Sequence, residues 1–88
     1  MPGKMVSKEE AIRRAKGIYA QKKARGDNFL EGPCISNGDE IPGWVVDIAH
    51  YPRRVIDDLP QYQCPAYRLG KIRHFVELDP DGNLIRAE

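Results

Sequence analysis

The sequence has few cysteines, no long apolar run and almost no net charge. Its 88 residues include only two cysteines, Cys34 and Cys64, which are too few for the disulfide framework of a small secreted scaffold. No apolar stretch approaches the roughly 20 residues that cross a bilayer. The N-terminal residues 1–6 also lack the apolar segment of a signal peptide. We therefore expect a cytoplasmic protein that does not enter the membrane.

The charge balance and the chain length further limit the kinds of protein and binding site that this sequence can form. Fourteen basic and thirteen acidic residues leave a net charge of +1, so the surface as a whole is not strongly polarised, although a local basic patch stays open. Ordinary apolar and charged fractions of 41% and 31% exclude global disorder. A chain of this length forms one domain with a modest core. A shallow groove, a surface patch or a homodimer face suits this size better than a deep pocket, and we expect no cofactor.

The N-terminal third predicts one amphipathic helix over residues 8–25. Ser7 is a good N-cap, and Glu10 three residues later completes a capping box. Gly26 is placed to end the helix in a left-handed cap. The apolar stripe at helical spacing consists of Ala11, Ile12, Ala15, Ile18 and Tyr19. Residues 1–6 are expected to form a flexible tail, and residues 7–88 a single domain.

The clearest local signal is the stretch His74–Ala87, which predicts two strands joined by a tight turn. Pro80 and Asp81 suit the central positions of this turn, and Gly82 supplies a positive φ. Another strand is predicted at 44–48, where apolar side chains occupy mainly one face. The glycine- and proline-rich segment 26–43 predicts a loop with a short extended piece at 29–30 or 34–36.

Residues 51–70 form an irregular insert between these strands. The insert contains three prolines and three tyrosines, which predict an ordered loop with a short helical turn. Loops of this length in compact domains are often functional. The elements together predict an α+β fold, in which one N-terminal helix packs on a small antiparallel sheet of three to four strands that ends in a C-terminal β-hairpin. One sheet face would stay open to water or to a partner.

Three segments of the chain resemble the pattern of PepSY-type domains. These segments are Glu9–Ala15 at the helix start, Gly43–Ile48 in the first predicted strand and Val76–Ile85 in the hairpin. Domains of that family have a helix followed by a strand meander, and their last hairpin often carries an acidic residue, a small turn and a glycine. The resemblance implies a similar fold. The family has been linked to protease inhibition but has no catalytic motif, so the resemblance implies no activity.

Two cysteines and two histidines make a nominal set of zinc ligands: Cys34, His50, Cys64 and His74. No pair of them has the spacing of two to four residues that most structural zinc sites use, so they are weak candidates and we expect no metal. Free thiols, a disulfide and metal-bound or reactive thiols all stay open for the cysteines. Cys34 lies in a glycine-containing loop where a histidine such as His50 could activate it as a nucleophile, but no nucleophile motif surrounds it.

Asp47 and Glu77 are predicted to lie on neighbouring strands, where two hypotheses apply. They could form a pair of carboxylates, or they could be solvent-facing acids matched to Arg73 or Arg86 across the sheet. We favour the second hypothesis, because cross-strand charge pairs are common on exposed sheet faces.

The sequence does not identify a reaction, and we expect a small non-catalytic domain that binds an unidentified protein partner or forms a homodimer. The alternative is RNA or DNA binding through a basic helix face, if helix and insert converge. A cysteine- or metal-dependent enzyme is the third hypothesis. The candidate binding residues are aromatic anchors and arginines: Tyr51, Tyr62, Tyr67, Arg13, Arg14, Arg53 and Arg54.

Overall fold

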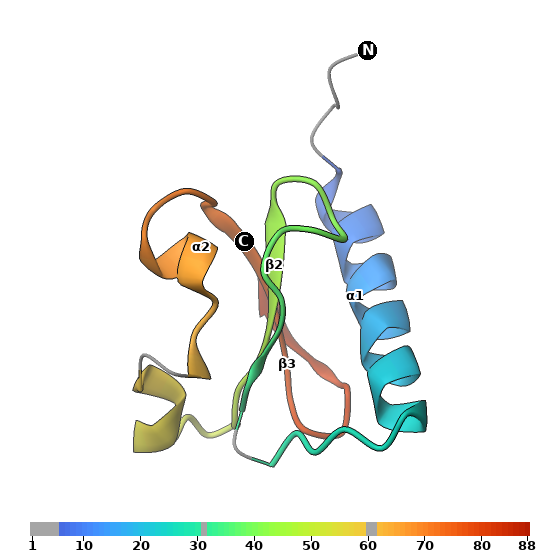
Figure 1. The fold of residues 1–88 in the computed structure, drawn as a ribbon, viewed down its shortest axis with the longest axis vertical. Coiled ribbons are helices and arrows are strands. Elements are labelled where there is room, and N and C mark those ends of the chain that lie inside the picture. Colours follow the sequence, from blue (N-terminus) through green and yellow to red (C-terminus); the bar gives the residue numbers. More distant parts are fainter. Residues whose placement is uncertain (1–5, 31, 60–61) are drawn as a thin grey trace.

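The computed structural model describes residues 6–30, 32–59 and 62–88 of the chain. A four-stranded sheet separates two layers: the long helix α1 covers one face, and the insert with η1 and α2 lies on the other (Figure 1). The strand order is β1-β2-β3-β4. The elements, in chain order, are α1 (Lys8–Ala24), β1 (Cys34–Ser36), β2 (Trp44–Ile48), η1 (Val55–Asp58), α2 (Pro65–Arg68), β3 (His74–Leu78) and β4 (Leu84–Ala87).

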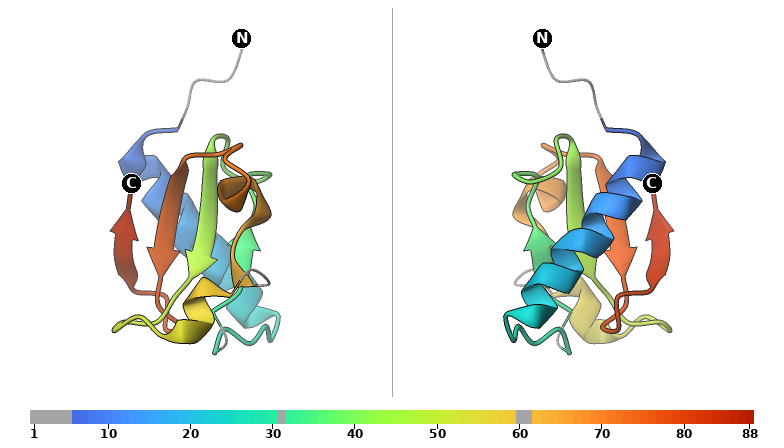
Figure 2. Two further views of the ribbon diagram at one scale, coloured as in Figure 1. Left: turned by 90° about the vertical axis from the view of Figure 1, so that its left-hand side faces the viewer. Right: turned by 90° about the vertical axis from the view of Figure 1, so that its right-hand side faces the viewer.

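Helix α1 begins and ends as its sequence predicts. The backbone N–H of Glu10 donates a hydrogen bond to Ser7 Oγ at 3.2 Å, which satisfies one of the unpaired donors of the first turn. After the helix, Gly26 has a φ of +96°, a conformation that costs little only for glycine. Figure 2 shows the helix lying diagonally across the sheet. The buried residues of the helix come from the predicted stripe: Ala11, Ala15, Ile18 and Tyr19.

The predicted fold class is confirmed, with one difference in how the central strands pair. Strand β1 is antiparallel to β2, and β3 is antiparallel to β4, but β2 and β3 run parallel, in register from Trp44↔His74 to Ile48↔Leu78. The sheet is therefore mixed, where an antiparallel meander was expected. A parallel pair needs a long crossover connection, and the insert at 51–70 supplies it.

The C-terminal hairpin turn forms at the predicted residues. The N–H of Gly82 donates to the carbonyl of Asp79 at 2.9 Å, and Gly82 has a φ of +88°. A Cβ at this glycine would lie 2.5 Å from a ring carbon of Tyr19. Tyr19 also donates its hydroxyl hydrogen bond to the carbonyl of Pro80 at 2.7 Å. The turn therefore needs glycine both for its backbone and for the close approach of α1.

The hydrophobic core lies between α1 and the sheet. The sheet contributes alternate residues of β2 and β3, including the fully buried Val46, Ile48, Val76 and Leu78. At the helix start, Trp44 Nε1 donates to the carbonyl of Val6 at 2.9 Å, so this residue of the predicted tail lies against the domain. Residues 1–5 of that tail lie outside the described part of the chain.

The opposite sheet face is not open, in contrast to our expectation from the sequence. A disulfide joins Cys34 on β1 to Cys64 at the start of α2, with a sulfur–sulfur distance of 2.07 Å. This bond ties the insert to the sheet, which places η1 and α2 over the outer face (Figures 1 and 2). We call the sheet surface beneath the insert the outer face.

Candidate functional site

The two cysteines and two histidines do not form a common site. Cys34 and Cys64 are bonded to each other, so neither sulfur is available as a thiolate ligand or nucleophile. His50 lies against the insert, whereas the His74 ring packs against Trp44 with 5.0 Å between the ring centroids. In the described part of the chain, no group of three histidine, cysteine, aspartate or glutamate side chains could hold a metal ion.

His50 and Asp57 instead form a partly buried link across the start of the insert. The His50 ring lies between two oxygen atoms, with Nδ1 2.8 Å from Asp57 Oδ1 and Nε2 2.8 Å from the carbonyl oxygen of Leu30. Burial alone would raise the pKa of the Asp57 carboxyl. Hydrogen bonds from the N–H groups of Arg54 and His50 outweigh this effect and hold that pKa below its usual value. The link closes the loop 50–57 and is structural.

Three of the predicted binding residues gather in one groove at the tip of the hairpin. Tyr51, Arg53 and Arg54 line this groove together with Leu30, His50, Pro52 and the turn residues 79–81, and its volume is about 580 Å³. We call it the hairpin groove. Tyr51 and Leu30 are 82% and 70% exposed, so both side chains are accessible to a partner. Segments far apart in the sequence therefore meet here.

The remaining predicted binding residues lie elsewhere. Tyr62 is half-buried, and Tyr67 on α2 packs edge-on against Phe75, with 5.2 Å between ring centroids. On α1, the side chains of Arg13 and Arg14 both donate to the carboxylate of Glu10. Because α1 and the insert lie on opposite faces of the sheet, the arginines of the helix do not meet the tyrosines of the insert (Figure 1).

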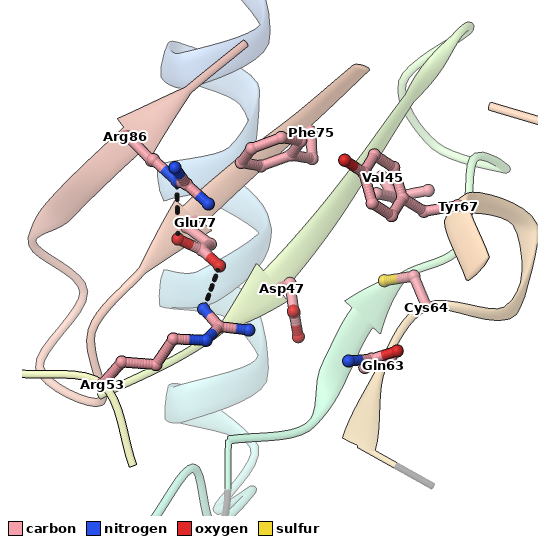
Figure 3. A pocket seen from close by; sticks show the side chains of 9 residues that line it. All are labelled: Val45, Asp47, Arg53, Gln63, Cys64, Tyr67, Phe75, Glu77 and Arg86. Atoms are coloured by element: carbon pink, nitrogen blue, oxygen red, sulfur yellow. Dashed lines mark hydrogen bonds and ion pairs between the residues drawn. The ribbon is translucent and has the colours of Figure 1, made fainter. Parts of the chain in front are cut away.

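The outer face holds a second cavity, which we call the outer pocket (Figure 3). Its volume is about 110 Å³. Its floor comes from alternate residues of β2 and β3 and from β4, and its wall from the insert. The lining residues are Val45, Asp47, Phe75, Glu77 and Arg86 on the strands, and Arg53, Gln63, Cys64 and Tyr67 on the insert.

Strand register explains why charged residues meet in this pocket. Cys34 pairs with Asp47, Asp47 with Glu77, and Glu77 with Arg86, so four side chains form one row across all four strands. Directly paired residues project from the same face of a sheet. The disulfide lies at one end of this row and brings the insert over it.

The two carboxylates of the row have very different surroundings. Glu77 is only 6% exposed and accepts hydrogen bonds from Arg53 Nη1 at 2.9 Å and Arg86 Nε at 3.2 Å (Figure 3). Asp47 has a buried Oδ1 atom with no hydrogen-bond partner among the described residues. Burial and the neighbouring charge of Glu77 raise the pKa of Asp47 to about 8. At neutral pH the carboxyl group of Asp47 is therefore mostly protonated.

Sequence reasoning recognised Asp47 and Glu77 as cross-strand neighbours but expected them to face solvent. The pairing of Glu77 with Arg86 is confirmed, whereas Asp47 is enclosed because the insert covers it. Arg53 was predicted as a surface binding residue, and its contact with Glu77 was not foreseen. The disulfide that encloses the pocket cannot be inferred from the spacing of two cysteines.

Comparison with family models, with curated proteins and with solved structures finds no match. The resemblance to PepSY-type domains thus stays a prediction. In the described residues, no helix combines the length and the apolar character needed to cross a membrane.

Proposed function

We propose that this chain is a small non-catalytic binding domain that docks an extended segment of a protein partner in the hairpin groove. The observation that carries the proposal is the convergence of Tyr51, Arg53 and Arg54 with the exposed Leu30 around one groove. Tyrosine and arginine are enriched among the residues that dominate binding energy at interfaces. Such side chains cost less to order when a rigid scaffold presents them, and the His50–Asp57 link holds this loop.

The charges around the hairpin groove favour a protein over a nucleic acid. Arg53 and Arg54 line one side, whereas Asp79 and Asp81 at the hairpin turn line the other. Acidic side chains repel phosphate groups, but a polypeptide segment can present both charge signs. The basic residues of α1 add little to a nucleic-acid surface here, since Arg13 and Arg14 contact Glu10 on the far side of the sheet. Nucleic-acid binding stays the alternative.

The third hypothesis, a cysteine- or metal-dependent enzyme, has the least support, because the disulfide occupies both sulfurs. The same bond bears on where the protein works. Disulfides persist in oxidising compartments and in the cytosol of some hyperthermophiles. A cytoplasmic location therefore requires a cytosol in which this disulfide persists, because a reducing cytosol would open the bond that ties the insert to the sheet.

The proposal is tested by photo-crosslinking from within the groove. A benzoylphenylalanine placed at position 51 should crosslink to a specific protein in extracts of the source cells, at moderate salt. The matched control places the same group at Leu69, which is also exposed, at 66%, but lies outside the hairpin groove. Competition by the unlabelled chain should remove the product, and competition by the Arg54→Glu variant should not.

Other outcomes of this experiment contradict the proposal. Crosslinks that are equally strong from position 69 would mean non-specific contact. A product that is sensitive to ribonuclease would favour the nucleic-acid alternative. A product with twice the mass of the chain, together with a concentration-dependent dimer in sedimentation, would replace the heterologous partner with a second copy of this chain.

A further inference from the structure

The outer pocket contains an acid with a buried oxygen that lacks a hydrogen-bond donor. Both arginines that line the pocket, Arg53 and Arg86, donate to Glu77. Asp47 Oδ1 has no hydrogen-bond partner among the described residues. A ligand that carries a positively charged N–H group would supply the missing donor and would favour the ionised form of Asp47.

The cavity also limits the size and shape of such a ligand. Its volume of about 110 Å³ is smaller than the engineered cavities of about 150 Å³ that hold a benzene molecule. Val45, Phe75 and Tyr67 line it with apolar and aromatic surface next to Asp47 (Figure 3). A short alkyl chain fits such a surface, and a terminal cation gains further from nearby aromatic rings. The buried Oδ1 of Asp47 still needs a hydrogen-bond donor.

We propose that the outer pocket binds a primary ammonium group on a short alkyl chain, which donates a hydrogen bond to Asp47 Oδ1. The ammonium group donates to the unpartnered oxygen and places a positive charge beside the carboxylate, while its alkyl chain lies against Val45 and Phe75. An anion would meet both Asp47 and Glu77 and would have to compete with Glu77 for its arginines. Arg53 lines both this pocket and the hairpin groove, but the proposal for the pocket rests on Asp47 and does not depend on the proposal for the groove.

Binding at this site is coupled to a proton. In the folded chain, burial and Glu77 keep Asp47 protonated at neutral pH, since its pKa is raised to about 8. An ammonium group has an ordinary pKa near 10.4, so it is charged at neutral pH. Beside Asp47 it favours the ionised carboxylate, so binding releases one proton from Asp47. Besides Glu77, the ionisable groups facing Asp47 from the elements around it are Arg53, Asp57, Tyr67 and Arg86; Cys34 is in the disulfide and does not titrate.

The test compares three probes of equal length on the whole chain, followed by NMR and calorimetry. n-Butylammonium should shift the amide signals of Val45, Asp47 and Phe75, whereas n-butanol and n-butyrate should bind at least about tenfold more weakly. Its apparent affinity should rise about tenfold per pH unit between pH 6 and 7.5, because one proton is released. Nα-acetyl-lysine methylamide distinguishes two sources of the ammonium group, a lysine side chain and a free amine. If this compound also binds, the ligand is a lysine side chain. If only butylammonium binds, the ligand is a free amine.

Two variants separate the role of Asp47 from a general effect of charge. Asp47→Asn keeps the shape of the side chain and should lower the affinity for butylammonium at pH 8 by more than about tenfold. Asp39→Asn makes the same charge change on an exposed loop and should bind like the unchanged chain. Equal binding by Asp47→Asn overturns the proposal. If that variant does not fold, a pH-independent affinity of the unchanged chain, or equal binding of butanol or butyrate, overturns it as well.

Discussion

The two faces of the sheet show two different ways of holding a small domain together. Beneath α1, the buried side chains of β2 and β3 are apolar, including Val46, Ile48, Val76 and Leu78. On the outer face, the row across the strands consists of Cys34, Asp47, Glu77 and Arg86. The first face is stabilised by packing. The second is held by one covalent bond and by ion pairs, which leaves room for a pocket.

The apolar face contributes mainly to stability, whereas the outer face provides the polar groups that a ligand can contact. An apolar face buried by a helix lowers the free energy of the folded chain but offers no polar groups to a ligand. The outer face buries charged groups, which costs free energy unless partners compensate them. Glu77 has such partners, whereas Asp47 Oδ1 has none among the described residues. The outer face is thus the less optimised half of the molecule, as expected of a surface that binds.

The largest effect is expected from a cavity on the apolar face. Leu78→Ala removes a fully buried side chain and should lower the free energy of unfolding by about 4 kcal/mol, from lost transfer energy and an unfilled cavity. Urea denaturation measures this loss. Leu69→Ala, at an exposed position, is the control and should change stability by less than about 0.5 kcal/mol. A loss below about 1 kcal/mol for Leu78→Ala would contradict the account of this face.

The disulfide is the corresponding test of the outer face. Replacing Cys34 and Cys64 together by alanine opens a loop of sequence separation 30 and should cost about 3.6 kcal/mol, mainly by increasing the freedom of the unfolded chain. Hydrogen exchange should show faster exchange of the amides of residues 62–70, while the amides of α1 keep the same relative protection among themselves. Unchanged exchange in the insert would show that packing, and not the bond, holds it on the sheet.

Asp47 should make the outer face sensitive to pH. Its pKa rises from an ordinary 3.8 to about 8 in the folded chain, so between these values the folded chain keeps a proton that the unfolded chain has lost. Stability therefore falls as pH rises through this window. Asp47→Asn removes this pH dependence. As pH rises from 5 to 7, the free energy of unfolding of the variant should therefore increase relative to that of the unchanged chain by about 1.4 kcal/mol per pH unit. Urea denaturation at each pH, with Asp39→Asn as control, measures this difference.

The smallest effect is expected where the apolar face uses a polar contact. Tyr19→Phe removes the hydroxyl that donates to the carbonyl of Pro80 and should cost about 1 kcal/mol. The ring itself stays, so the contact with Gly82 is kept. Thermal unfolding measures the loss, and the signals of Asp47 and Phe75 in the outer pocket should not move. Shifts there would mean that the two faces are not independent.

The sequence predicts most of the apolar face and little of the outer face. Helix α1, strand β2 and the turn 79–82 follow from local signals: a capping box, alternating apolar residues and a glycine at positive φ. Alternation of apolar and polar residues predicts which side chains share a face of the sheet. It does not predict whether two strands pair in parallel or antiparallel. The parallel pairing of β2 and β3 could have been inferred only from the length of the insert.

The candidate sites show the same division. Tyr51, Arg53 and Arg54 could be selected because aromatic residues and arginines in a long loop favour binding, and they do line one groove. The outer pocket could not be predicted, because it depends on the Cys34–Cys64 bond that places the insert over Asp47. Sequence spacing carries no information on that tertiary contact.

The central claim is that the outer face encloses an acid with a buried oxygen that lacks a hydrogen-bond donor, and the titration of Asp47 tests it most directly. We expect the side-chain carboxyl carbon of Asp47 to titrate in ¹³C NMR with a midpoint near pH 8, as burial and Glu77 require. Saturating butylammonium should move this midpoint down. A midpoint near the ordinary value of 3.8, unchanged by butylammonium, would contradict the account, because Asp47 would then be solvated or already paired.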